Sequence, residues 1–160
     1  MSDQHRSPRT GGGRRNHIDF RLKTDDGRVP EDLYDRDAER IAGALVEPVG
    51  GNRVKGVSRH RLRRLFDEVK RIQRRLQFTT EQDRDATWSA VLPLVKLLKS
   101  KVAYVAARAE RGEQEYYDAL KIFFTVGIDQ IFTAEDFERF ATLFEAVYGF
   151  YYERGGSKTA

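Results

Sequence analysis

The sequence contains no cysteine, so neither a disulfide framework nor a thiolate metal site can form within it. It also lacks an apolar run near the ~18 residues that a helix needs to span a bilayer. The N-terminus carries arginines but no apolar stretch of the kind found in a secretory signal. From these absences we expect a cytoplasmic protein that makes no membrane contact.

Side chains that could support catalysis are also few. The three histidines are His5, His17 and His60, and they form no His-x-x-x-His or Glu-x-x-His pair. Gly11–Gly13 follows no strand, and Gly50–Gly51 lacks the lysine and hydroxyl of a phosphate-binding loop. We therefore predict no enzyme activity, no cofactor and no metal site.

The formal net charge of +4 conceals an uneven distribution along the chain. Residues 48–78 carry 10 Lys and Arg against 2 Asp and Glu, whereas residues 113–160 carry 4 against 9. A basic block joined to an acidic block can bind a polyanion on one face and a basic partner on another. The alternative is that both blocks are ordinary solvated helix faces.

Patterns in the N-terminal third of the chain are weak. Residues 1–30 are polar, basic and rich in glycine, which predicts a flexible tail. Within them Ile18, Phe20 and Leu22 alternate with polar residues as in a strand, but no partner strand is evident. Residues 31–56 should form an acidic helix that ends near residue 47, followed by a glycine-rich linker.

Residues 57–156 carry apolar residues at helical spacing, without the alternation of a strand. Ser58, Thr80 and Thr133 are suited to cap helices, and Pro93 should bend one helix or divide it. The four apolar stripes are Leu62, Leu65, Phe66, Val69, Ile72 and Leu76; Val91, Leu94, Val95, Leu98, Val102, Val105 and Ala109; Tyr116, Leu120, Phe123, Phe124, Ile128 and Ile131; and Phe137, Phe140, Ala141, Phe144, Val147, Tyr148 and Tyr151. With the acidic helix they predict an all-α fold, a compact bundle of about five helices.

The most informative segment is Ser58–Arg75, which holds eight Lys or Arg and two acids. Because apolar residues take its core face, the basic side chains must cover the rest of the helix surface. Arginine predominates, and its planar guanidinium can donate two parallel hydrogen bonds to a phosphate. The candidate RNA-binding residues in this segment are Arg59, Arg61, Arg63, Arg64, Lys70 and Arg71.

Two of these arginines, Arg59 and Arg61, fall in the first helical turn. A cation there should cost about 0.3–1 kcal/mol, because that end of a helix is already positive. A capped helix start ringed by arginine is, however, a suitable anion site. We therefore favour an anionic ligand at the Ser58 end over exposed cations that are merely tolerated.

A second set of candidates follows Pro93. Lys101 and Arg108 are seven residues apart with Tyr104 between them, and Lys99 lies elsewhere on the same helix. Tyr104 could stack on a base or a ribose. Alternatively, it packs at the margin of the core.

Three segments carry a likeness to a known family. They are VSRHRLRRLFDEV (Val57–Val69), LPLVKLLKSKVAYVAARAERG (Leu92–Gly112) and EDFERFATLFEAVYGFYYERGG (Glu135–Gly156). In this order they resemble a basic helix, a central Leu-Lys-x-Lys-x-Ala-Tyr-x-x-Ala-Arg signature and a C-terminal helix of the small helical subunit of the type III-A CRISPR effector (Csm) complex. That family commonly has glutamine where this chain has Arg61, and residues 1–50 match nothing in it.

The resemblance implies a non-catalytic protein of antiviral defence, present in several copies beside the repeated backbone subunits of the effector. It implies that basic residues face the guide RNA and the target RNA and read shape and phosphate. By motif match, the RNA contacts would come from Arg63, Arg64, Lys99, Lys101 and Arg108. The alternatives are a free-standing basic helical nucleic-acid-binding protein and an adaptor whose acidic end docks a basic partner.

Overall fold

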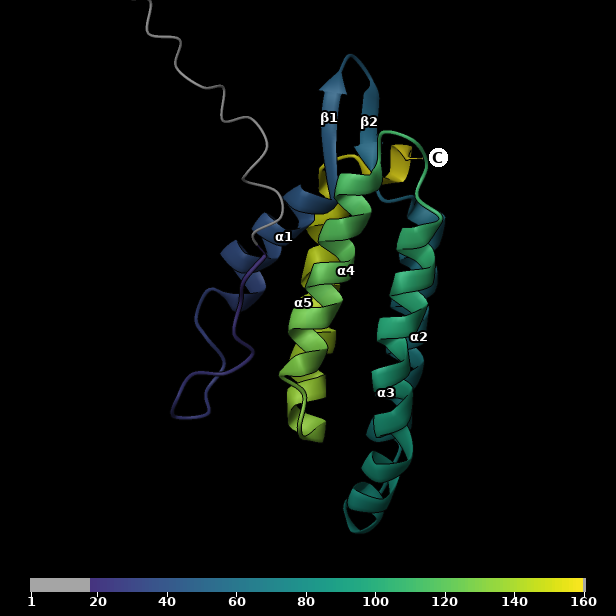
Figure 1. Ribbon diagram of the computed structural model, residues 1–160. Coiled ribbons are helices and arrows are strands. Elements are labelled where there is room, and N and C mark those ends of the chain that lie inside the picture. The colour runs from purple at the N-terminus through teal and green to yellow at the C-terminus, as the bar shows by residue number, and fades with distance from the viewer. Residues whose placement is uncertain (1–17, 160) are drawn as a thin grey trace, which may run out of the picture.

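A computed structural model describes residues 18–159 (Figure 1). The helices are α1 (Ala38–Leu45), α2 (Arg59–Gln77), α3 (Arg84–Ala107), α4 (Gln114–Asp129) and α5 (Ala134–Glu153), and the strands are β1 (Val46–Gly50) and β2 (Arg53–Gly56). Short helical turns lie at Leu33–Asp37, Glu81–Asp83 and Gly156–Lys158. The predicted all-α bundle of about five helices is therefore confirmed, with one small sheet added. The part of the predicted tail that covers residues 1–17, including Gly11–Gly13, lies outside the described residues.

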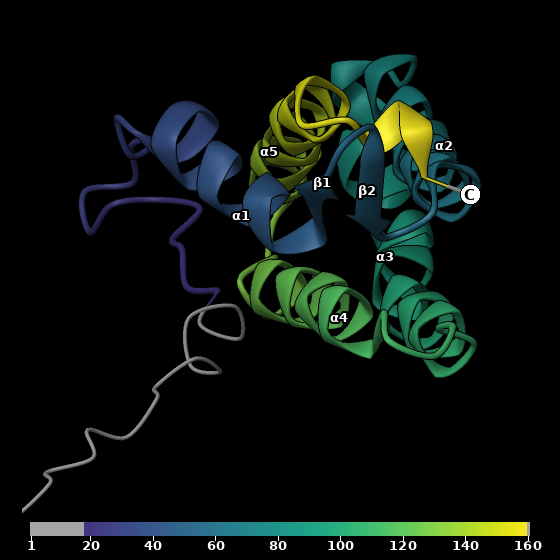
Figure 2. The same ribbon diagram turned by 90° about the horizontal axis from the view of Figure 1, so that it is seen from above.

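The helices form a bundle in which α2 and α3 are one antiparallel pair. On the inner side of this pair, α2 contacts α5 and α3 contacts α4, while α1 packs against both α4 and α5 (Figure 2). The α2–α3 pair extends beyond the end of α4 and α5 that lies opposite the β-hairpin (Figure 1). Within residues 18–159 no helix has the length and apolar character needed to cross a membrane.

The helix starts follow the local signals in the sequence. The Ser58 hydroxyl accepts a hydrogen bond from the Arg61 amide, and the Thr80 hydroxyl accepts one from the Asp83 amide. Thr133 and Asp136 form a capping box at the start of α5. All three predicted caps are confirmed. α3 continues through Pro93, so the alternative in which the helix ends and restarts there is wrong.

The apolar stripes converge on one core that is rich in phenylalanine. The rings of Phe123, Phe124, Phe140 and Phe144 are all buried, and Phe124 lies 5.5 Å from Phe140 and 5.3 Å from Phe144, centroid to centroid. Gly127 allows this packing, because a Cβ atom there would lie 2.3 Å from the Phe140 ring. Most of the predicted stripe residues are buried, but Leu94 is 38% exposed.

Residues 18–30 differ from the predicted tail. Ile18, Phe20 and Leu22 are buried in the same core as the helices. Their alternation reflects no strand. Instead, the Gln130 side chain accepts a hydrogen bond from the Leu22 amide and donates one to the Phe20 carbonyl, both at 2.9 Å. A glutamine amide thus takes the place of the missing partner strand.

The segment predicted as an acidic helix and a linker is more ordered than expected. A π-helical turn at Leu33–Asp37 leads into α1, which ends at Leu45. Beyond it β1 and β2 pair antiparallel, with Val46 opposite Gly56. Gly50 and Gly51 have φ values of 111° and 60°, so the glycines that suggested a linker build the hairpin turn instead.

Candidate nucleic-acid interface

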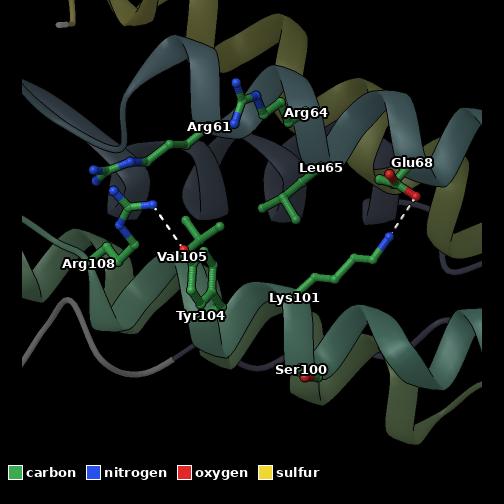
Figure 3. Close-up of a pocket in the computed structure, with 9 residues that line it drawn as sticks. All are labelled: Arg61, Arg64, Leu65, Glu68, Ser100, Lys101, Tyr104, Val105 and Arg108. Carbon is green, nitrogen blue, oxygen red and sulfur yellow. Dashed lines mark hydrogen bonds and ion pairs between the residues drawn. The ribbon is translucent and has the colours of Figure 1, made fainter.

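A groove on the outer side of the α2–α3 pair holds five of the predicted site residues: Arg61, Arg64, Lys101, Tyr104 and Arg108 (Figure 3). The hollow has a volume of about 500 Å³, and four cationic side chains and one carboxylate line it. A second hollow of about 370 Å³ adjoins it at the N-terminal end of α2 and shares its three arginines.

Helical spacing explains why these residues meet. On α2 the groove residues Arg61, Arg64 and Glu68 stand at i, i+3 and i+7, which is one line along a helix. On α3, Lys101 and Arg108 flank Tyr104 at the same spacing. Because α2 and α3 run antiparallel and pack side by side, the two lines face each other across the groove (Figure 3).

Arg61 is held in place by a residue from α4. Its Nη1 donates a hydrogen bond at 3.0 Å to the hydroxyl of Tyr117, and its guanidinium carbon lies 5.3 Å from the centre of that ring. Tyr117 itself is completely buried. The sequence stripe passed over Tyr117 in favour of its neighbour Tyr116, so this support for Arg61 was missed.

Arg108 and Tyr104 form a second arginine–tyrosine pair at the C-terminal end of α3, where Arg108 is the residue that follows the helix. Arg108 Nη1 donates a hydrogen bond at 3.0 Å to the Tyr104 hydroxyl, and its guanidinium carbon lies 5.5 Å from the ring centre. Tyr104 is 63% exposed, so it does not belong to the core. The guanidinium groups of Arg108 and Arg61 point toward the same end of the groove (Figure 3).

The other two cations of the groove differ in their pairing. Lys101 lies 2.9 Å from the carboxylate of Glu68, which also pairs with Arg71 at 3.2 Å. The hydrogen bond from Lys101 is the largest cause of a lowered Glu68 pKa. Arg64, by contrast, forms no ion pair within residues 18–159 and is exposed. It is therefore the groove cation that is readiest to bind a new anion.

The remaining candidates lie on other surfaces. On the α5 side of α2, Arg63 pairs with Asp67 at 3.4 Å and Lys70 pairs with Glu145 at 3.1 Å. Lys99 pairs with Asp129 of α4. Arg71 follows Arg64 along α2, beyond Glu68, and Arg59 donates a hydrogen bond to the Ser157 carbonyl. Arg63 and Arg64, two adjacent candidates, thus lie on different sides of α2.

At the start of α2, where the sequence predicted an anion site, two backbone amides are not free to bind an anion. The Ser58 amide donates to the Tyr117 hydroxyl at 3.0 Å, and the Arg59 amide donates to the Thr159 hydroxyl at 2.8 Å. Thr159 comes from the C-terminal segment, 100 residues away, and is buried. No local pattern could have revealed it. An anionic ligand can therefore reach the arginine side chains, but it cannot bind these two amides.

Metal-binding groups are absent from the described part of the chain, in that no three His, Asp or Glu residues there are placed to hold an ion. The groove is instead a concave, basic surface with one exposed aromatic ring. Such a surface can bind phosphate through its guanidinium groups and stack a base or a sugar on the ring.

Comparison with known protein families shows the family to which the chain belongs. The Csm2 Type III-A family matches residues 35–156. The chain belongs to the Csm2 family. No curated protein and no solved structure matched it. The resemblance inferred from the three sequence segments is therefore confirmed, and the chain is a small subunit of the type III-A CRISPR effector complex. The expectation that residues 1–50 match nothing in the family is wrong for residues 35–50, which the match includes. Membership of a multi-subunit complex sets aside the free-standing nucleic-acid-binding protein.

The Csm2 match covers the groove but not the two ends of the chain. The whole groove between α2 and α3 lies inside residues 35–156. The buried segment that includes Phe20 and Leu22 lies outside the match, as does Thr159. The groove therefore belongs to the part of the chain that the family shares. Residues outside the match, such as Phe20, Leu22 and Thr159, contact that part at Gln130 and at Arg59.

Proposed function

We propose that this Csm2-family protein is a non-catalytic subunit that lines the effector filament in the cytoplasm and contacts the backbone of the guide and target RNA through the α2–α3 groove. The repeated backbone subunits and further copies of itself would be its neighbours there. The observation that carries the proposal is the convergence of Arg61, Arg64, Lys101 and Arg108 from two helices on one hollow.

The chemistry of the groove favours a phosphate backbone over a specific base sequence. Guanidinium and ammonium groups donate to phosphate oxygens whatever the base, so the contact is sequence-independent and weakens with salt. Two of the arginines are already braced by tyrosines, which lowers the entropy lost when they bind. Tyr104, exposed at the groove margin, can add stacking without sequence preference.

The test exploits the split between Arg63 and Arg64. Both are exposed arginines on α2, but Arg64 lines the groove, whereas Arg63 pairs with Asp67 on the side toward α5. Binding of a fluorescein-labelled single-stranded RNA is measured by anisotropy over a range of salt concentrations. Arg64→Gln should weaken binding and reduce the salt slope by about 0.7, the value for one lost phosphate contact on a single strand.

Arg63→Gln is the matched control, because it removes the same charge from the same helix. It should leave the slope nearly unchanged. In the assembled effector, Arg64→Gln should weaken target RNA binding and leave the cleavage chemistry of other subunits intact. Equal effects of the two variants would contradict the proposal, because binding would then follow total charge and not the groove.

A further inference from the structure

The α2–α3 groove continues past Glu68 and Lys101, and its character changes there. A further hollow of about 240 Å³ shares these two residues and is otherwise lined by Arg71, Ile72, Arg75, Leu94 and Leu97. Another depression adjoins it through Arg75 and reaches Phe78 at the end of α2. This lower groove, defined by Arg71, Ile72, Arg75, Phe78, Leu94 and Leu97, lies toward the end of the helix pair that extends beyond α4 and α5 (Figure 1).

Three large apolar side chains of the lower groove are open to solvent. Leu94 is 38% exposed, Leu97 is 45% exposed and Phe78 is 86% exposed. Ala90, at the end of the depression, precedes Leu94 by one helical turn. The α3 positions therefore follow the i, i+4, i+7 spacing of an apolar coiled-coil seam, whereas the α2 side carries Arg71 and Arg75 at the same spacing before Phe78, the residue that follows α2. An apolar line on α3 beside a basic line on α2 leaves a site for a third helix on the outer side of the pair.

The rim of the lower groove is basic. Arg71 and Arg75 border it on the α2 side. Two carboxylates lie along the same surface: Glu68 already pairs with Lys101 and Arg71, and Asp83, in the depression beyond Arg75, accepts a hydrogen bond from the Thr80 hydroxyl. A phosphate backbone gains nothing from exposed leucine, so the apolar floor distinguishes this half of the groove from the RNA-contacting half. The apolar floor of the lower groove is formed by Leu94 and Leu97, and its basic rim by Arg71 and Arg75. A protein segment with apolar residues on one face and acidic residues beside them complements both.

The chain's own N-terminus does not fit this description. Residues 1–17 carry four arginines and one aspartate, and they contain no apolar stripe. Their charge repels the rim, and they supply nothing for the floor. The occupant must come from another molecule.

We propose that the lower groove docks an acidic amphipathic helix of another subunit of the effector complex. The helix would present leucine-sized side chains to Leu94 and Leu97 and carboxylates to Arg71 and Arg75, and the seam from Glu68 to Phe78 gives it about 15 Å of contact. The inference rests on membership of the complex and not on RNA binding by the upper half of the groove.

The absence of cysteine provides a direct probe. Leu97→Cys in the full chain creates a single thiol at a half-exposed site, where an environment-sensitive fluorophore can be attached without entering the core. The probe ligand is a 21-residue helical peptide with leucine at heptad positions and glutamate beside them. The same peptide with lysine in place of glutamate is the control. The glutamate peptide should shift the fluorophore emission and saturate, with an affinity at least about tenfold above that of the lysine peptide.

Charge reversal sharpens the test. The double variant Arg71→Glu/Arg75→Glu should invert the preference between the two peptides, while Arg64→Gln, which we expect to weaken RNA binding, should leave it unchanged. In the effector reconstituted without target RNA, the fluorophore at position 97 should become shielded from a soluble quencher. Three results would overturn the proposal: no preference between peptides, shielding that appears only with RNA, or an emission shift that depends only on the concentration of the labelled chain itself.

Discussion

Tyr117 holds the guanidinium of Arg61 from inside the bundle, with 3.0 Å between the phenol oxygen and Nη1 and 5.3 Å between the ring centre and the guanidinium carbon. The same oxygen accepts a hydrogen bond from the Ser58 amide. One buried residue of α4 therefore fixes the start of α2 and, at the same time, a cation of the groove. The other nitrogen donors of Arg61 are left to bind a ligand.

This arrangement predicts that Tyr117→Phe weakens RNA binding without changing its salt dependence. The variant removes no charge, so the slope of log affinity against log salt should stay constant, while Arg61→Gln should reduce it by about 0.7. Loss of the hydroxyl leaves the Ser58 amide without its acceptor and should lower the free energy of unfolding by about 1–3 kcal/mol. Anisotropy titrations and urea denaturation measure the two effects separately. Unchanged RNA affinity for Tyr117→Phe would show that Arg61 does not depend on this hydroxyl.

The parts of the fold that could be predicted are those with local causes. Ser58, Thr80 and Thr133 are caps because a short oxygen-bearing side chain precedes a helical stripe, and the stripes themselves repeat at the period of a helix. The Gln130 contacts with Phe20 and Leu22 join residues about 110 positions apart, so no window of sequence contains them. The hydrogen bond between the Arg59 amide and Thr159 could not be predicted for the same reason, because 100 positions separate the two residues.

The candidate site shows a similar division. Helical geometry separates Arg63 and Arg64 into adjacent rows, and this much follows from the sequence. Which row faces α3 depends on how α2 rotates to bury Leu65 and Val69, and that is decided by packing against α3 and α5. The sequence therefore identifies the helices and their rows of basic residues, but not which row faces α3.

Gln130 should be important for stability, because its side chain satisfies two backbone groups of a segment that has no strand partner. Gln130→Ala would leave the Leu22 amide and the Phe20 carbonyl without this partner, and we expect a loss of about 1–3 kcal/mol for each group that stays buried. Urea denaturation measures it. Gln114→Ala is the control, since Gln114 is exposed and its amide bonds only to Asp118 on the same helix. Equal stability of the two variants would contradict the role assigned to Gln130.

Phe140 and Gly127 should show strong coupling. Phe140→Ala removes a fully buried ring and should cost about 3–5 kcal/mol. Gly127→Ala forces a methyl group to within 2.3 Å of that ring, so it should also destabilise the protein, by about 1–3 kcal/mol. In the double variant the methyl group enters the space that the ring has left. The combined loss should therefore be smaller than the two single losses added together, and additive losses would rule out the clash.

Asp136 should make stability depend on pH in the acidic range. The residue is 1% exposed, and its Oδ2 accepts hydrogen bonds from the Phe132 and Thr133 amides at 3.0 and 3.1 Å. Burial alone would raise the pKa of Asp136, but these amides together with Lys23 outweigh it, and the pKa is lowered from the ordinary value of 3.8. A carboxyl whose pKa is lower in the folded state than in the unfolded chain stabilises the folded protein at pH values above its unfolded-state pKa. This contribution is lost as the pH falls through the lowered value.

The variant Asp136→Asn should therefore lose about 1–3 kcal/mol of unfolding free energy near neutral pH, because an amide cannot accept from both backbone groups and pair with Arg139. The difference from the unmodified protein should shrink steadily below about pH 4, where the carboxyl begins to protonate in the unfolded chain. Urea denaturation across this range measures the difference. Asp32→Asn is the control, since Asp32 is half-exposed and lies 4.0 Å from Arg36, a surface pair that adds little. A difference for Asp136→Asn that stays constant down to the acid limit would show that the ionised carboxylate is not the source of the stability.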